Sequence, residues 1–490
     1  MRYLWFSTLL LVACAPRAVV RPEEPRQWLS APTLEEVPEE HGSWEQEPIR
    51  GDRSEFKNEI ASGPSASNSR VVRVDRLPGV RTPGGRKGTR GYAFFEFAPS
   101  GGAGMGAPCA CTTPTGAKGE ALTFTRASNG TCTKTATGGL TTTGIANGDL
   151  VVCTNNQPRV EYDSQGVLGL LVESSRTNSA LRSQELDNAA WISVTTAGAV
   201  TVTADFAVAP DGTTTAERIQ YTACPTASTS SSRGQTGMVG LGTSASGSFY
   251  VKGNGTSGNV GLALGAGAAY AGATCAYNST TWTRCTLTSA VTTSELYIGC
   301  FNNAVVSPNP GDTGSGDILV WGGQAEAGAY VTSYIPTVGA TVPRSAETAS
   351  IALPASAPAL NSTAASWNPP ASYASGFYNA GRLQKDASNN ILMTNNAASP
   401  APLLCTYTVG GSAYQGASTG ANINVSQANR VVCAYDGVNV IACTNGTCAN
   451  TARSFTNYSA AVSFDIGGPS VQGDGITSRL CLDPDASRCR

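Results

Sequence analysis

The side chains that perform most hydrolytic chemistry are scarce in this chain. Its 490 residues include a single histidine, His41, which lies in a stretch rich in proline and glutamate. A Ser-His-Asp or Cys-His arrangement needs an imidazole beside its nucleophile, so neither can form in the part that we expect to fold. Zinc sites built on histidine are excluded for the same reason. No glycine-rich loop has the lysine that binds phosphate.

Paired carboxylates are the catalytic arrangement that the composition still allows, because two acids suffice for glycoside hydrolysis. The acids of the predicted sheets are Glu173, Asp205, Asp211, Glu217, Glu295, Asp317, Glu326, Asp386, Asp436, Asp465 and Asp474. Most of them lie at turns or strand ends, where aspartate is common for conformational reasons. We therefore predict that the protein is not an enzyme, with a polysaccharide-acting glycosidase or lyase as the alternative.

No cofactor is predicted. Aspartate and asparagine at turns could hold Ca²⁺, but their spacing matches no calcium-binding loop. The net charge is −2, so the overall charge favours neither nucleic acid nor a membrane surface as partner.

Binding of sugars is the remaining chemistry, and it uses exposed aromatic rings against apolar sugar faces. Trp282 opens a predicted strand after a polar loop, and Trp367 lies in a predicted surface loop, Ser366–Pro370. Trp191 is the third candidate, with a structural role as its alternative. Trp321 ends an apolar run and is predicted to lie in the core.

Residues 1–13 predict a secretion signal. Arg2 gives a positive start, and Tyr3–Ala13 is mostly apolar and too short to span a bilayer. The end of the segment, Leu11 to Cys14, resembles a bacterial lipobox, which implies acylation of Cys14 and an anchor in the lipid bilayer. Ala15 after the cysteine implies a bacterial envelope protein of the outer membrane that faces the periplasm or the cell surface. An ordinary signal peptide with an incidental cysteine is the alternative.

The elements that must position any binding residue are predicted to be strands. Charged residues make up 13% of the chain and glycine totals 55, which suits all-β modules with many turns. Short apolar runs such as Val167–Val172 are separated by turn residues such as Asp211-Gly212. We predict two β-sandwich domains after a disordered tether. The segments are residues 1–13 (signal peptide), 14–90 (linker), 91–182 (a small β region), 183–345 (first sandwich) and 346–490 (second sandwich).

Cysteine usage agrees with export. Of 15 cysteines, Cys14 is assigned to lipid, and the even remainder suggests disulfides. The sequence-local pairs are Cys132 with Cys153, Cys275 with Cys285, Cys443 with Cys448, and Cys481 with Cys489. Spacing alone does not fix the connectivity, and reduced core thiols are the alternative.

Several short segments resemble tail-fibre or spike-type proteins of phages and prophages. These segments are Phe124–Ser128 (FTRAS), Pro158–Tyr162 (PRVEY), Gly169–Asn178 (GLLVESSRTN), Gly322–Gly328 (GGQAEAG) and Thr332–Thr337 (TSYIPT). The last two resemble the closing segment of jelly-roll modules similar to carbohydrate-binding modules. The resemblance implies a jelly-roll architecture for residues 183–345.

The C-terminal part resembles concanavalin-A-like lectin and laminin-G domains. Arg430–Tyr435 is a predicted strand, Asp436-Gly437 turns the chain, and Asn445-Gly446 turns it again. Phe464–Gly468 resembles a later strand of those domains.

Together these observations predict a surface-anchored lipoprotein with non-catalytic sandwiches that bind a glycan or another cell-surface polymer. A structural or adhesive fibre-like protein derived from a prophage, which binds no sugar and forms a homo-oligomer, is the alternative.

Overall fold

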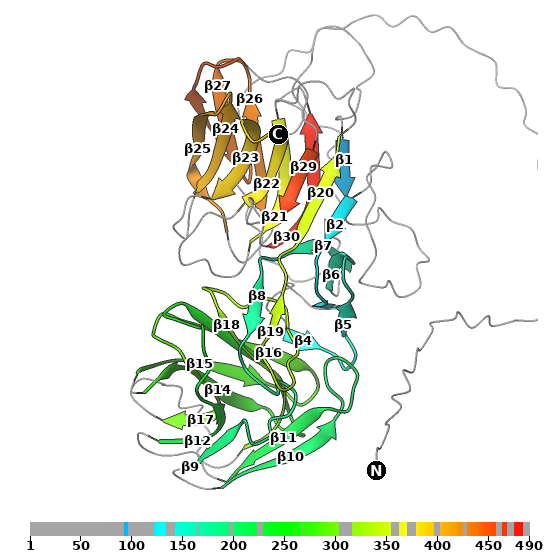
Figure 1. Ribbon diagram of the computed structural model, residues 1–490, viewed down its shortest axis with the longest axis vertical. Coiled ribbons are helices and arrows are strands. Elements are labelled where there is room, and N and C mark those ends of the chain that lie inside the picture. The colour runs from blue at the N-terminus through cyan, green and yellow to red at the C-terminus, as the bar shows by residue number, and fades with distance from the viewer. Residues whose placement is uncertain are drawn as a thin grey trace, which may run out of the picture. The chain divides into compact units, whose positions relative to one another are not determined.

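The computed structural model describes the chain in separate ranges, which are residues 93–96, 122–133, 143–163, 166–195, 199–222, 229–267, 269–302, 316–353, 362–369, 379–395, 402–424, 429–456, 463–467 and 475–483. Every regular element in these ranges is a β-strand, so the predicted all-β fold is confirmed (Figure 1). The described residues contain no helix of the length and apolarity that crossing a membrane requires. The predicted signal peptide, Cys14 and the predicted linker lie outside the described residues.

The first pair of sheets encloses one apolar core. The six-stranded sheet has the order β10 (Val200–Ala207), β11 (Ala216–Tyr221), β18 (Gly316–Ala327), β13 (Ala245–Gly253), β16 (Trp282–Ser289) and β4 (Thr143–Ile145). The five-stranded sheet has the order β15 (Ala269–Tyr277), β14 (Gly258–Ala266), β17 (Glu295–Asn302), β12 (Thr229–Gln235) and β9 (Ile192–Thr195). Phe249 and Val320 from one sheet and Leu262 and Ile298 from the other belong to the same buried cluster. The two sheets therefore form a β-sandwich.

The second pair of sheets is built in the same way. The eight-stranded sheet has the order β28 (Thr447–Ala452), β27 (Asn439–Thr444), β26 (Asn429–Tyr435), β21 (Ser362–Asn368), β30 (Gly475–Asp483), β7 (Gly166–Val172) and β6 (Arg159–Asp163), and β1 (Ala93–Glu96) also pairs with β30. The seven-stranded sheet has the order β2 (Leu122–Thr125), β20 (Thr348–Ala352), β29 (Ser463–Gly467), β22 (Asn379–Asp386), β23 (Asn389–Asn395), β24 (Pro402–Val409) and β25 (Ser412–Asn422). Val431 and Trp367 share a buried cluster with Ile391 and Phe464 of the other sheet.

Two short ladders complete the described strands. They pair β8 (Arg176–Asn178) with β19 (Val342–Arg344), and β3 (Gly130–Thr133) with β5 (Leu150–Cys153). Along the chain, β8 follows β7 of the second sheet pair and β19 precedes β20 of the same pair. The β8–β19 ladder therefore lies where the chain leaves and re-enters that pair.

Several strands of residues 91–182 pair with strands outside that range. β1 and β7 pair with β30, β2 pairs with β20, and β4 pairs with β16. Strands of three to seven residues bury little surface by themselves, and these four gain partners in larger sheets. The boundaries at residues 183, 345 and 346 stay predictions.

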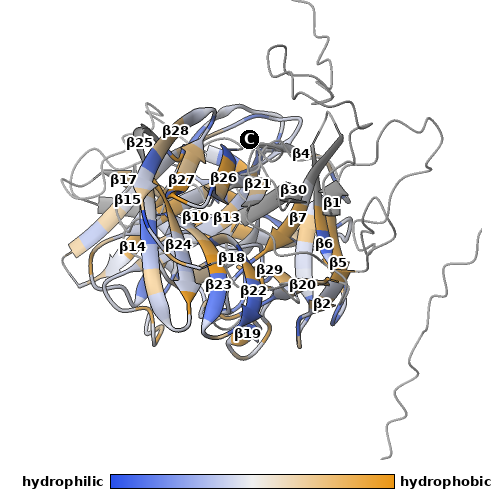
Figure 2. Ribbon diagram, turned by 90° about the horizontal axis from the view of Figure 1, so that it is seen from above, coloured by the Kyte–Doolittle hydropathy of each residue, from blue (hydrophilic) through white to orange (hydrophobic). Residues whose placement is uncertain are grey.

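Local sequence signals positioned several elements correctly. Leu170, Leu171 and Val172 of β7 are buried, and β7 is coloured as a hydrophobic strand in Figure 2. Asp436-Gly437 separates β26 from β27, and Asn445-Gly446 separates β27 from β28. Asn445 has φ 50° and Gly446 has φ 88°. A two-residue hairpin needs this left-handed geometry at both positions, which asparagine and glycine adopt most readily.

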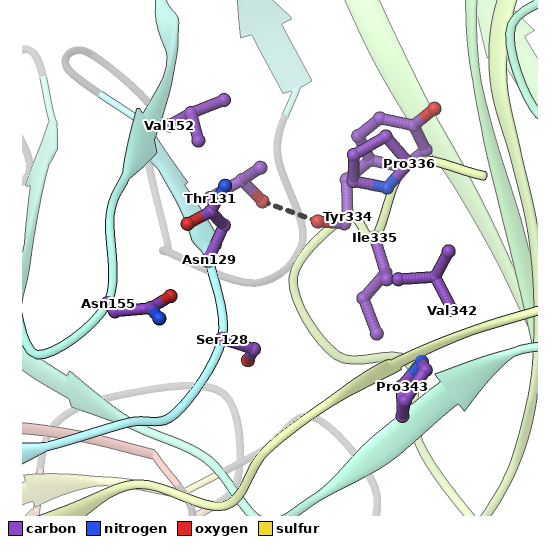
Figure 3. A pocket seen from close by; sticks show the side chains of 11 residues that line it. Ser128, Asn129, Thr131, Val152, Asn155, Tyr334, Ile335, Pro336, Val342 and Pro343 are labelled. Atoms are coloured by element: carbon purple, nitrogen blue, oxygen red, sulfur yellow. Dashed lines mark hydrogen bonds between the residues drawn. The ribbon is translucent and has the colours of Figure 1, made fainter. Parts of the chain in front are cut away.

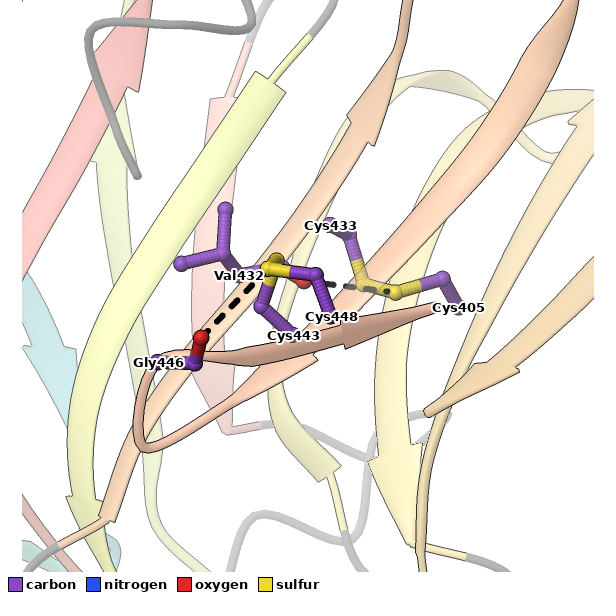
Figure 4. Close-up of a disulfide and its surroundings, with 6 residues drawn as sticks. All are labelled: Cys405, Val432, Cys433, Cys443, Gly446 and Cys448. Atoms are coloured by element: carbon purple, nitrogen blue, oxygen red, sulfur yellow. Dashed lines mark hydrogen bonds between the residues drawn. A yellow bond between two sulfur atoms is a disulfide. The ribbon is translucent and has the colours of Figure 1, made fainter. Parts of the chain in front are cut away.

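Three disulfides have both of their cysteines among the described residues. Cys275–Cys285 and Cys443–Cys448 confirm two predicted pairs. The third, Cys405–Cys433, was not predicted and joins β24 of the seven-stranded sheet to β26 of the eight-stranded sheet (Figure 4).

The predicted pair Cys132–Cys153 is wrong. The two sulfur atoms lie 3.3 Å apart on neighbouring strands, farther than the roughly 2.05 Å of a disulfide bond. Cys153 is disulfide-bonded, but Cys132 is not its partner. The pair Cys481–Cys489 stays a prediction, because Cys489 lies outside the described residues.

Candidate functional site

None of the three candidate tryptophans presents its ring at the surface. Trp191, Trp282 and Trp367 are 1%, 0% and 1% exposed. The indole N–H of Trp282 donates to Asn147 Oδ1 at 2.9 Å, and that of Trp191 donates to the carbonyl of Leu181 at 3.0 Å. The prediction of exposed binding rings is therefore wrong, because each large apolar ring is more stable inside a core when its polar N–H finds a partner there.

Polar residues of the tail-fibre-like segments meet in a buried charge cluster. The cluster consists of Arg126, Arg159, Glu173, Ser333, Arg344 and Glu347. The charged side chains of its ion pairs are at most 1% exposed. Arg126, Arg159, Glu173 and Ser333 come from separate tail-fibre-like segments, whereas Arg344 and Glu347 belong to none of them. Only the fold brings the six residues together.

Glu347 is the most connected acid of the cluster. Its Oε1 accepts hydrogen bonds from Arg126 Nη1 at 2.6 Å and from Arg159 Nε at 2.7 Å. Its Oε2 accepts from Arg159 Nη2 at 2.6 Å and from the backbone N–H of Glu173 at 2.8 Å. Four donors therefore satisfy one buried carboxylate, and three of them are cationic, which makes the bonds stronger than neutral ones.

Glu173, the second acid of the cluster, is bonded to Arg159, Ser333 and Arg344. Burial alone would raise its pKa, but Arg344, Arg159 and a hydrogen bond from Ser333 outweigh burial and hold the pKa well below its usual range. The Ser333 backbone N–H donates to Glu173 Oε1 at 2.8 Å, and the Ser333 hydroxyl donates to Oε2 at 2.7 Å. Glu173 is thus ionised and saturated, which suits a structural role and leaves it no free oxygen for acid–base catalysis.

A second acid pair lies in the first sandwich. Glu217 of β11 is 1% exposed, and Asp187 lies on the exposed turn before β9. Burial and a hydrogen bond with the Asp187 carboxyl raise the pKa of Glu217 to about 9, although Arg233 acts in the opposite direction. At neutral pH Glu217 is therefore protonated, as a buried carboxyl beside a like charge must be.

This pair predicts a pH dependence of stability. The folded protein holds the Glu217 proton more tightly than the unfolded chain, whose pKa is near 4.5. Unfolding free energy should therefore fall as the pH rises from about 5 to 9, with a slope of up to about 1.4 kcal/mol per pH unit. The unfolding free energy of the Glu217→Gln variant, measured by urea denaturation, should not show this fall between about pH 5 and 9. Glu185→Gln, at a more exposed glutamate, is the control. If the unfolding free energies of both variants change with pH at the same slope, the Glu217–Asp187 pair does not cause the pH dependence.

The outer face of the five-stranded sheet positions two tyrosines and a glutamate together. Tyr270 of β15 and Glu295 of β17 are both registered with Gly265 of β14. Tyr297 of β17 is registered with Gly234 of β12. Residues in register lie on the same face of a sheet, and the intervening apolar residues of these strands fill the core. We call Tyr270, Glu295 and Tyr297 the tyrosine face.

Glycines allow the two rings to lie against the sheet. A Cβ on Gly234 would overlap the ring of Tyr297, and a Cβ on Gly265 would overlap the ring of Tyr270. The ring centroids are 6.0 Å apart with an interplanar angle of 67°. Glycine inside a strand marks a close approach of this kind. The tyrosine face was not predicted from the sequence. The glycines inside these strands are the signal that could have indicated it.

Glu295 joins the two rings and keeps one oxygen open. Its Oε2 accepts hydrogen bonds from both tyrosine hydroxyls, at 3.1 Å from Tyr297. Its Oε1 accepts none from the described residues. All three side chains are partly exposed.

The tyrosine hydroxyls remain donors across the physiological pH range. Burial and the charge of Glu295 raise the pKa of Tyr297 to about 12. Burial and the hydrogen bond to Glu295 also raise the pKa of Tyr270. The face therefore offers two apolar ring surfaces beside a charged acceptor. Within the described residues, no group of three or more histidine, cysteine, aspartate or glutamate side chains is placed to hold a metal ion.

Comparison with known proteins adds no family to these observations. No protein-family model matches the chain, and no curated protein matches it at a significant level.

Proposed function

We propose that this chain is a non-catalytic glycan-binding protein and that the tyrosine face holds the sugar. The observation that supports the proposal is the pairing of two partly exposed rings with a carboxylate whose Oε1 accepts no hydrogen bond from the described residues. A pyranose has apolar C–H faces that pack on aromatic rings, and its hydroxyls donate well to an ionised acceptor.

The same proposal includes the location of the protein. The lipobox-like end at Cys14 supports an acylated anchor in the bacterial cell envelope. The three disulfides support an oxidising compartment, because disulfides persist outside the cytosol. A glycan or another cell-surface polymer is the partner that fits this setting.

A structural role without sugar binding is the second candidate. Rings that lie over glycines also seal the surface of a sheet, and the tyrosine hydroxyls are already bonded to Glu295. In that case the face would stabilise the sandwich and bind nothing.

Replacing one ring separates the two candidates. Tyr297→Ala should weaken binding of the best ligand on a glycan array by about tenfold or more, because tenfold corresponds to about 1.4 kcal/mol and an aromatic hot-spot residue contributes about 2 kcal/mol or more. Tyr297→Phe should bind almost as well, because the ring remains. The measurement is a titration of the full chain in detergent.

Tyr414 provides the matched control for this titration. It is a partly exposed tyrosine on β25 that packs on Phe455, 4.7 Å between ring centroids, outside the tyrosine face. Tyr414→Ala should leave glycan binding unchanged. Equal losses for the two alanine variants, or no ligand on the array, would reject the glycan-binding proposal.

A further inference from the structure

A pocket next to the buried charge cluster has two chemically different walls. One wall comes from β5, which contributes Val152, and from the turns before β3 and after β5, which contribute Asn129 and Asn155. The other wall includes Ile335, Val342 and Pro343. Figure 3 shows Ser128 and Asn155 on one side and Ile335, Val342 and Pro343 on the other. The cavity volume is about 410 Å³, which lies within the roughly 300–1,000 Å³ range of small-ligand sites. We call it the amide pocket.

The polar groups of the amide pocket are neutral. Asn129 and Asn155 are exposed, and their side-chain amides form no hydrogen bond with other described residues. Each amide therefore offers a donor and an acceptor to a ligand. Tyr334 also lines the pocket, but it is buried and its hydroxyl lies 2.7 Å from Ser183 Oγ, within hydrogen-bonding distance.

Both walls are held in place before any ligand arrives. The backbone N–H of Ile335 donates to Gln324 Oε1 at 2.7 Å, and its carbonyl accepts from Asn178 Nδ2 at 2.8 Å. On the opposite wall, a Cβ on Gly130 would lie 3.0 Å from both Arg126 Cζ and Arg159 Cδ, so the buried charge cluster lies directly behind the pocket. A preformed site binds more tightly because it loses less conformational entropy.

We propose that the amide pocket binds a single N-acetylated hexosamine residue, a proposal that rests on glycan binding as the protein's function. The N-acetyl group has an amide that pairs with Asn129 or Asn155 and a methyl that packs on Ile335 and Val342. None of the described lining residues carries an ionised side chain, which favours a neutral sugar over a uronic acid. The tyrosine face, on another sheet, would contact the rest of the polymer.

The test compares monosaccharides on the full chain by ligand-detected NMR titration. N-acetylglucosamine and N-acetylgalactosamine should bind at least tenfold more tightly than glucose, galactose or glucuronate. The double variant Asn129→Ala/Asn155→Ala should lose at least fivefold of the affinity for the two N-acetylated sugars. Both asparagines are exposed, so its thermal unfolding should match that of the parent protein.

Two further results separate this inference from the function on which it rests. Tyr297→Ala should weaken polymer binding and leave N-acetylhexosamine binding unchanged. Equal binding of glucose or glucuronate, or an unchanged affinity in the double asparagine variant, would overturn the amide pocket while polymer binding still supported the tyrosine face. If the chain bound no glycan in either assay, both proposals would fall.

Discussion

Replacement of Glu347 by glutamine should lower the unfolding free energy by about 3–5 kcal/mol, the usual cost of breaking a buried ion pair on one side. Glutamine has nearly the same shape but no charge, and one of its terminal atoms is a donor. It would leave Arg126 without its carboxylate and Arg159 with Glu173 alone. Urea denaturation followed by tryptophan fluorescence measures the change.

The matched control for this variant is Glu185→Gln. Glu185 also pairs with an arginine, Arg182, at 2.9 Å, but the two side chains are 42% and 34% exposed. Such pairs contribute less than about 1 kcal/mol, because water and salt screen them. If the two variants were equally stable, the buried charge cluster would not be the stabilising feature that its geometry indicates.

Removal of the Cys405–Cys433 disulfide is expected to have the second-largest effect. The two cysteines are 28 residues apart and belong to different sheets. Closing a loop of that length removes enough entropy from the unfolded chain to contribute about 3.6 kcal/mol. Thermal unfolding of the double variant Cys405→Ala/Cys433→Ala should therefore shift to a clearly lower temperature.

The Cys443–Cys448 disulfide is the internal comparison. It closes only five residues, and its cysteines are registered opposite each other in one hairpin. The same loop-closure estimate gives about 2 kcal/mol for this disulfide. The unfolding free energy of Cys443→Ala/Cys448→Ala should therefore fall by about 1.5 kcal/mol less than that of Cys405→Ala/Cys433→Ala. A larger loss for the hairpin disulfide than for the disulfide between sheets would contradict the loop-closure explanation.

Local patterns predicted the features of this chain that depend on nearby residues. The hairpin at Asn445-Gly446 follows from the φ preferences of two adjacent residues. Cys275 pairs with Cys285 across ten residues, a separation that sequence spacing suggests. The all-β class follows from composition and short apolar runs.

Features that depend on distant strands could not be predicted in this way. Trp282 follows a polar loop in the sequence, yet its ring enters a core to which Ile145 contributes from a remote strand. Cys405 and Cys433 approach each other only when two sheets pack. Tyr270 and Glu295 meet across β14, so their hydrogen bond depends on strand order and register, which one sequence does not specify.

The pairing of β1 and β7 with β30 has a consequence for biogenesis. Ala93 is registered with Leu482 and Val172 with Gly475. A ribosome makes these early strands long before β30, so the edges that pair with β30 stay open until β30 emerges. Such edges invite aggregation, and contacts this far apart form slowly. A chain that stops before Gly475 would lack β30 and would leave the edges of β1 and β7 without this partner.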